Sequence, residues 1–284
     1  MFNDDKLEKI ITMPDTSSVL SSGAYSTVYN GLSLAIAAML AGTLFFFFSR
    51  TQVGFKYRPA LLVSALVTAI ACYHYFRIFN SWVDAHAVNS AGGYGLTQST
   101  FNDAYRYMDW ILTVPLLMVE LVAVLGLPKE ESRGLLVKLA IAAFFMIALG
   151  YPGEIQTNLV QRTIWGTLST IPFVYIMVVL WNQLSASLSR QPETVKPLVR
   201  GARLLTLASW GFYPIAYMVP LLGAGVPYES KVVALQIGYT IADIIAKVGL
   251  GVFIYFIAMA KTENDAKTGA SPFEPAFAGA ATPA

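Results

Sequence analysis

Seven apolar runs, separated by short connections, constrain the fold of this chain more than any other feature. Each run can cross a bilayer as a helix, because a span needs roughly 20 residues that each rise 1.5 Å. Charges, glycines and prolines bound the runs, which cover approximately residues 25–48, 59–79, 101–127, 134–151, 163–187, 198–222 and 232–260. The pattern predicts an all-α membrane protein, a bundle of seven transmembrane helices.

The composition agrees with a multi-pass membrane protein. Of the 284 residues, 56% are hydrophobic and 13% are charged, whereas a soluble domain has about 25% charged residues. A single cysteine, Cys72, excludes an internal disulfide and a cysteine-based metal cluster. The two histidines leave little scope for a metal site, and the scattered basic residues do not form a nucleic-acid surface. We therefore expect no metal and no nucleic-acid partner.

The basic residues predict the orientation of the bundle. With the N-terminus outside, twelve Lys and Arg residues lie in inner segments and four in outer segments, which matches the excess of positive charge expected inside. The first twenty residues show no signal peptide, so insertion would depend on the first span. We expect an extracellular segment over 1–21, a helical domain over 22–261 and a disordered inner tail over 262–284. The outer connection at 80–100 is long enough for a hairpin over the outer mouth.

The last apolar run contains an acid and an amine at its centre, Asp243 and Lys247. They are four residues apart, so they lie on one face of a helix and can interact. A charge at mid-membrane costs about 2.5 kcal/mol or more, which makes such residues candidates for function. Two readings are open at this point. The two side chains form a structural ion pair, or Lys247 is a desolvated, reactive amine of the kind that forms imines.

The third run contains most of the remaining charge within the spans. Its polar residues are spaced three, four and seven apart and form one stripe along a helix, which consists of Arg106, Asp109, Thr113 and Glu120. Glu120 follows Asp109 by eleven residues and lies on the order of 16 Å further inward. The stripe is either a set of polar groups satisfied within the bundle or a relay of carboxylates that passes protons in sequence.

Further candidates lie in neighbouring runs. His74, in the second run, is either a histidine satisfied within the core or a partner that hydrogen-bonds Asp109 and shares its titration. Pro214 should kink the sixth helix. Aromatic side chains near mid-span would suit a long, flat, conjugated ligand, although such stripes are usually packing residues. They are Trp110, Trp165, Trp210, Phe212 and Tyr213.

Over residues 22–260 the chain resembles the microbial rhodopsins. Four motifs carry the resemblance, namely RYMDWILTVP at 106–115, GYPGE at 150–154, WGFYP at 210–214 and DIIAK at 243–247. The sequence is most similar to the xanthorhodopsin branch of bacterial proton pumps. That similarity rests on YHYFRI at 73–78, STIPF at 169–173 and YTIAD at 239–243.

The resemblance implies a light-driven outward proton pump, not an enzyme. Lys247 would bind all-trans retinal as a protonated Schiff base, with Asp109 as counterion and first proton acceptor and Asp243 as second counterion. Glu120 would return a proton from the inside. Asp109, Thr113 and Glu120 match the Asp-Thr-Glu triplet of outward proton pumps, His74 matches the histidine that bonds the acceptor, and Arg106 would lie outward of the two counterions.

The resemblance also implies a retinal pocket. Its expected lining is Trp110, Leu117, Met146, Gly150, Ser169, Thr170, Trp210, Tyr213 and Pro214. Leu117 occupies the position where leucine accompanies green absorption. Gly166 falls where xanthorhodopsin has a glycine that admits the ring of a carotenoid antenna, although glycine in a membrane helix is also a common packing residue.

The family suggests further expectations about partners and alternatives. We expect a multi-pass protein of a bacterial cell membrane that contacts the lipid bilayer, moves protons and forms a homo-oligomer, either a pentamer or a trimer. No pair of glutamates lies shortly before Asp243, and the nearest acid upstream is Glu229, fourteen residues earlier, so no residue is assigned as the proton-release group. A photosensor that signals through a transducer would use the same retinal site. A chemically driven transporter or receptor without a chromophore is a third class.

Overall fold

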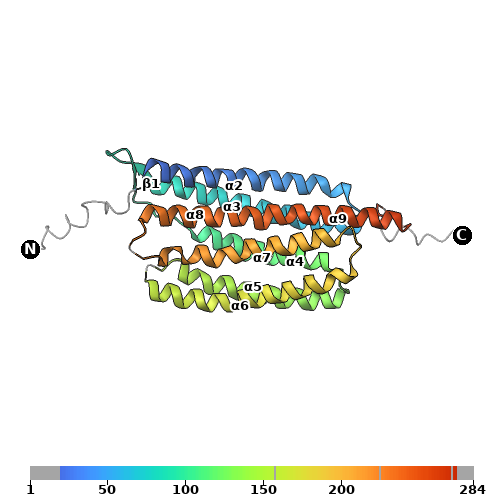
Figure 1. Cartoon of the computed structure of the whole chain (residues 1–284). Helices are drawn as coiled ribbons and strands as arrows, with labels where there is room; N and C mark the ends of the chain where they lie inside the picture. The colour runs from blue at the N-terminus through green and yellow to red at the C-terminus, as the bar shows by residue number, and fades with distance from the viewer. Residues whose placement is uncertain (1–19, 157, 224, 270, 274–284) are drawn as a thin grey trace, which may run out of the picture.

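The computed structural model describes residues 20–273 except 157, 224 and 270. The predicted outer segment up to residue 19 and the end of the tail from residue 274 lie outside the described residues. In Figure 1 the start of the first helix and the end of the last helix lie at opposite ends of the molecule. A chain that crosses the bundle an odd number of times begins its first helix and ends its last helix at opposite ends.

Long helices account for most of the described chain. They are α2 (Ser22–Ser49), α3 (Arg58–Ala85), α4 (Ala104–Leu125), α5 (Lys129–Glu154), α6 (Leu159–Ser187), α7 (Lys196–Met218), α8 (Tyr228–Ile244) and α9 (Leu250–Lys267). A π-helical turn at Ile245–Gly249 joins α8 to α9, so these two form one continuous rod. The described residues therefore form seven rods that lie side by side (Figure 1), and the predicted seven-helix bundle is confirmed.

The order of the helices in the bundle follows their order in the chain. Each rod packs against the next one, and α8 packs against α2, so the ring closes. Short connections favour this arrangement because consecutive antiparallel helices then become neighbours. The ring positions the inner faces of α3, α4, α7 and α8 toward one another.

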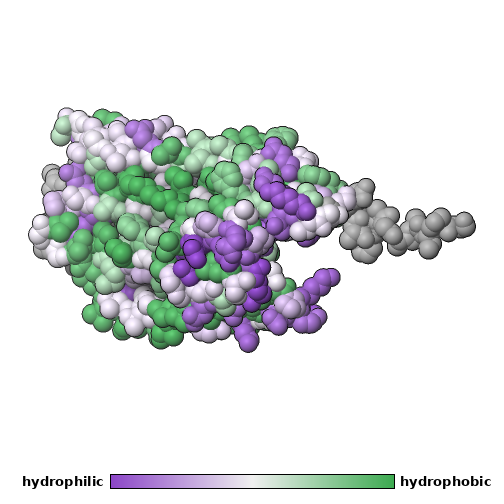
Figure 2. Space-filling model, turned by 45° about the vertical axis from the view of Figure 1, so that its right-hand side comes forward, coloured by the Kyte–Doolittle hydropathy of each residue, from purple (hydrophilic) through white to green (hydrophobic). Residues whose placement is uncertain are grey.

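The outer surface of the bundle suits a lipid environment. Within the described residues, six helical segments are long and apolar enough to span a membrane, and α4 packs between two of them. Large apolar side chains point outward, with Leu34, Phe48 and Ile171 all more than 60% exposed. Figure 2 shows hydrophobic residues along the sides of the molecule and hydrophilic residues gathered at the end that faces the viewer. The protein is a multi-pass membrane protein.

The connection after α3 contains the predicted hairpin. Strand β1 (His86–Val88) pairs antiparallel with β2 (Tyr94–Leu96), and Ala87 lies opposite Gly95. Gly92 has a φ of 79°, which glycine adopts without a steric penalty. The hairpin lies at the end of the bundle where α2 begins (Figure 1). Following the orientation predicted from the basic residues, we call this the outer end and the opposite one the inner end.

The last helix is longer than the sequence predicted. We expected a disordered tail from residue 262, but α9 continues to Lys267. Thr262 explains part of the difference, because its hydroxyl donates to the carbonyl of Ala258 at 2.7 Å and accepts from the backbone N–H of Gly54 at 2.8 Å. Contacts with the α2–α3 turn thus hold the helix beyond the apolar run.

Candidate functional site

The amine of Lys247 lies between two carboxylates in the centre of the bundle. Its Nζ is 2.8 Å from Asp109 Oδ2 on α4 and 2.7 Å from Asp243 Oδ1 on α8. All three side chains are at most 1% exposed. Lys247 belongs to the π-helical turn, a local widening of the helix that often occurs at functional sites. The helical spacing predicted the approach of Asp243 to Lys247, and the resemblance implied that Asp109 approaches the same amine from a different helix.

The two carboxylates differ in their other partners. Asp243 accepts hydrogen bonds from Tyr75 Oη at 2.8 Å, Tyr213 Oη at 2.5 Å and Trp110 Nε1 at 3.1 Å. The carboxylate of Asp109 forms no hydrogen bond with a neutral group among the described residues. Thr113 donates to the backbone carbonyl of Asp109 at 2.9 Å and not to its carboxylate. Hydrogen bonds stabilise a carboxylate's charge, so Asp243 holds its negative charge more firmly than Asp109 does.

His74 lies beside Asp109 but does not form the expected hydrogen bond. Its Nδ1 is 3.9 Å from Asp109 Oδ1, which is too long for a hydrogen bond. The same nitrogen lies 3.0 Å from the carbonyl of Ile70, one turn earlier on α3. The imidazole N–H of His74 therefore bonds the backbone carbonyl of Ile70. The predicted hydrogen bond between His74 and Asp109 does not form, and the two side chains only lie close together.

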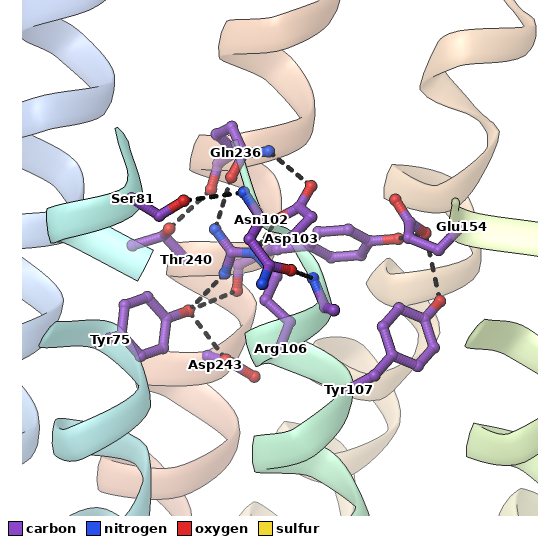
Figure 3. A network of polar contacts seen from close by, with 12 residues as sticks. Tyr75, Ser81, Asn102, Asp103, Arg106, Tyr107, Glu154, Gln236, Thr240 and Asp243 are labelled. Atoms are coloured by element: carbon purple, nitrogen blue, oxygen red, sulfur yellow. Dashed lines mark hydrogen bonds and ion pairs between the residues drawn. The ribbon is translucent and has the colours of Figure 1, made fainter. Parts of the chain in front are cut away.

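Arg106 connects the site to the outer end through several hydrogen bonds (Figure 3). Its guanidinium donates to Tyr75 Oη at 3.0 Å, Gln236 Oε1 at 2.7 Å and Asp103 Oδ1 at 3.1 Å. Gln236 also donates to Asp103 Oδ2 at 2.9 Å. Because Tyr75 bonds both Arg106 and Asp243, a continuous set of contacts runs from Asp243 to Asp103. No role was predicted for Tyr75, Asp103 or Gln236, although Asp103 lies one turn before Arg106.

A second ion pair lies near the outer end between α5 and α6. Arg162 Nη2 is 3.1 Å from Glu154 Oε1, and both side chains are 4% exposed. Tyr107 and Tyr239 each donate to Glu154 Oε2 at 3.2 Å. Arg162 is one of the four basic residues of the outer segments, and Glu154 is the last residue of the GYPGE motif, but no pairing between them was predicted.

Glu120 is buried apart from the other acids. It lies on α4, three turns inward of Asp109, and is 0% exposed. Within the described residues neither carboxyl oxygen forms a hydrogen bond. The hydroxyl of Ser64 faces Glu120 but donates to the carbonyl of Ala60 at 3.2 Å. The predicted stripe of Arg106, Asp109, Thr113 and Glu120 is buried along one inward face of α4, but its inner member is isolated.

An apolar cavity of about 310 Å³ reaches the amine of Lys247. Every residue expected to line a retinal pocket lines this cavity, and so do others that the sequence analysis did not name. The additional residues include Tyr107, Ile147, Phe173, Tyr217 and Tyr239. Trp165 and Phe212, two members of the aromatic set, do not line it. Lys247 contributes to the wall together with mostly aromatic and aliphatic side chains and a few hydroxyl groups, which suits a long apolar ligand with one reactive end.

Two glycines shape the cavity wall. A Cβ at Gly150 would lie 3.2 Å from both Ser169 and Tyr107, so the bare backbone there lets these side chains close the wall. A Cβ at Gly166 would lie 2.5 Å from the ring of Tyr217. The ring of Tyr217 therefore packs over Gly166, and both residues line the cavity.

Comparisons with known proteins identify the family. Residues 29–261 match the family described as bacteriorhodopsin-like protein. The chain is 30% identical to the green-light absorbing proteorhodopsin of Gamma-proteobacterium EBAC31A08, covering 83% of this chain and 89% of that one. It is 28% identical to the bacteriorhodopsin of Halobacterium salinarum, covering 78% and 80%.

Solved structures agree with these relatives. Xanthorhodopsin, described as a light-driven ion pump with dual chromophore, superposes with a TM-score of 0.81 at 52% identity, covering 87% of this chain and 98% of the other. A thermophilic rhodopsin gives the same TM-score at 46% identity and the same coverage. The chain belongs to the bacteriorhodopsin-like family and is a microbial rhodopsin.

Proposed function

We propose that this protein is a light-driven outward proton pump that carries retinal on Lys247. The observation that carries the proposal is one buried amine held between two carboxylates of unequal hydrogen bonding, at the end of an apolar cavity. The named relatives include proteorhodopsins and a bacteriorhodopsin. Their similarity to this chain supports the assignment.

The residues around the cavity fit retinal. The amine of Lys247 is placed for a covalent link to an aldehyde, and the aromatic walls at Trp110, Trp210 and Tyr213 can enclose a flat polyene. When bound, retinal supplies light absorption and a light-driven change of shape beside the lysine nitrogen. Gly150, Ser169 and Pro214 line the same cavity and would set its shape along the polyene.

Asp109 is the group best placed to accept a proton at the lysine nitrogen. Its Oδ2 lies 2.8 Å from Nζ, and the donors that stabilise charge on Asp243 have no counterpart on Asp109 within the described residues. Protonation of Asp109 therefore loses less hydrogen-bond energy than protonation of Asp243. His74, close to Asp109 but bonded to its own backbone, would influence the acceptor through space.

Glu120 would return a proton from the inner end. It is buried on the opposite side of Asp109 from Arg106 along α4. Burial without hydrogen bonds favours the neutral form of a carboxyl group, so Glu120 would hold a proton that it can donate. The acceptor faces the hydrogen-bonded outer half and the donor faces the inner end, which gives the transport its direction.

Gly166 and the outer surface of the bundle concern two further binding partners, a carotenoid and other copies of the chain. Gly166 lines the outer part of the cavity, beneath the Tyr217 ring. We propose a carotenoid at this place, as in a pump with dual chromophore, while a role of Gly166 in packing Tyr217 is the alternative. Excitation of added carotenoid should sensitise the pigment if the proposal is right. We also propose a homo-oligomer, a pentamer or a trimer, in a bacterial cell membrane.

The experiment that tests the pump is illumination of cells that express the chain with added retinal. The cells should be coloured, light should acidify an unbuffered suspension, and a protonophore should abolish the effect. Colour without acidification would favour a photosensor that signals through a transducer. Absence of colour would contradict retinal binding altogether.

A further inference from the structure

A second cavity opens at the inner end of the bundle. Its volume is about 190 Å³. It is lined by the end of α4, the turn after α6, the last turns of α9 and the start of α3, with the residues Tyr57, Leu125, Gly126, Arg190, Gln191, Pro192, Lys261, Asn264 and Asp265. Leu125 lies five residues after Glu120 on α4, about 7.5 Å along the helix axis. The cavity is therefore placed between Glu120 and the inner surface.

Apolar residues separate this cavity from Glu120. Leu121 and Leu125 follow Glu120 on the same helix, and both are buried. No hydrogen bond within the described residues leads away from the Glu120 carboxyl group. Within the part of the chain that the structure describes, no chain of hydrogen bonds links Glu120 to this cavity, so refilling Glu120 would require water to enter after a local opening.

The rim of the cavity is held by contacts between the α2–α3 turn and the end of α9 with the residues that follow it. Tyr57 Oη donates to Asp265 Oδ2 at 2.9 Å, and Lys56 Nζ lies 3.0 Å from the same oxygen. Phe55 N–H donates to the carbonyl of Pro272 at 2.7 Å, in addition to the bond between Gly54 and Thr262 described above. We call this set of contacts the inner clasp. Tyr57 and Asp265 belong both to the clasp and to the cavity wall.

We propose that the inner clasp is a gate that controls proton entry to Glu120, an inference that rests on the proposed pump. Among the described residues that line the cavity or pair with its wall, the charged groups are Lys56, Arg190, Lys261 and the acid Asp265. This positive rim disfavours a free proton while the clasp is closed. Local opening of α9 away from the α2–α3 turn would admit water and let Glu120 be refilled.

The direct test is Tyr57→Phe in the retinal-bound protein, because it removes one clasp hydrogen bond without changing charge. Loss of one such bond should raise the open population, and hence the rate of flash-induced proton uptake measured with a pH-sensitive dye, about fivefold. The early steps, in which Asp109 is protonated, should keep their rates. Tyr175→Phe is the matched control, since it makes the same uncharged replacement at an exposed tyrosine on α6 that does not line the cavity. It should leave uptake unchanged.

An unchanged rate of proton uptake in Tyr57→Phe would overturn the proposal that the inner clasp is a gate. A slower rate would also overturn it, because it would mean that the Tyr57 hydroxyl carries the proton. If wild-type protein fails to move protons in light, the proposed pump fails instead, so the two failures are distinguishable.

A chain that ends at Thr268 gives a second measurement. It lacks the Pro272 carbonyl that accepts from Phe55 N–H, so hydrogen exchange at Phe55 in the dark pigment and proton uptake should both become faster. Faster exchange with unchanged uptake would show that the clasp opens without gating the proton, and would overturn the inference.

Discussion

The outer and inner halves of the bundle are built differently around the same helix, α4. In the outer half, Tyr75 bonds both Asp243 and Arg106. Gln236 in turn bonds both Arg106 and Asp103, which lies near the outer end. In the inner half, Glu120 is fully buried, and its carboxyl oxygens form no hydrogen bond within the described residues. The difference teaches that, in the proposed pump, a proton released from Asp109 would find preformed hydrogen bonds close by on the outer side, whereas proton uptake on the inner side would need a structural opening. This asymmetry favours transport in one direction.

The largest expected effect comes from the residue between the two halves. Lys247→Ala should abolish pigment formation, because the amine that binds retinal is removed and Asp109 loses its positive partner. Absorbance of purified protein after addition of retinal measures the effect. Lys261→Ala, on the same rod but at the inner end, should remain coloured. Pigment with unchanged absorbance in Lys247→Ala would contradict the site.

Asp109→Asn should remove transport while colour remains, since Asp243 still balances the charge on Lys247. Light-driven acidification should fall about 100-fold or more, the usual contribution of a positioned proton acceptor. The comparison variant is Asp243→Asn, which deprives three hydrogen-bond donors of a charged acceptor and should lower pigment stability more. Equal pumping by Asp109→Asn and the wild type would remove Asp109 from the acceptor role.

Glu120→Gln tests the inner half alone. The variant should keep its colour and its early steps, while reprotonation slows about 100-fold because the internal proton donor is missing. Flash-induced absorbance changes give the rate. A small membrane-permeant weak acid should restore the rate, because it can carry protons through the apolar inner half. An unaltered photocycle would exclude Glu120 as the donor.

The smallest effect is expected at the outer ion pair. Glu154→Gln leaves Arg162 buried without its partner, so pigment stability should fall by about 3 kcal/mol, as for other broken buried pairs. Thermal loss of colour measures this. The double variant Glu154→Gln/Arg162→Gln should recover part of the loss. A double variant less stable than the single one would show that Arg162 stabilises the outer end through its carbonyl contacts with Gly153 and Tyr217 rather than through Glu154.

Features that depend on one helix at a time were predicted from the sequence. The seven rods follow from apolar length, the buried stripe on α4 follows from the helical period, and the approach of Asp243 to Lys247 follows from a spacing of one turn. The hairpin after α3 was also predicted from its length and glycines. These are local properties, and the geometry of a helix or a turn fixes them wherever the element packs.

Contacts between helices were decided by the tertiary structure. The rotation and depth of each rod in the ring decide which carboxylate of α4 faces Lys247. They also decide which tyrosines bind Asp243. His74 shows the limit most clearly, because its imidazole N–H had two acceptors within reach and the backbone of its own helix took it. Glu154 and Arg162 meet because the end of α5 and the start of α6 lie side by side across a short connection. A sequence encodes the polar groups, but competition among neighbours in the packed bundle decides which of them bond.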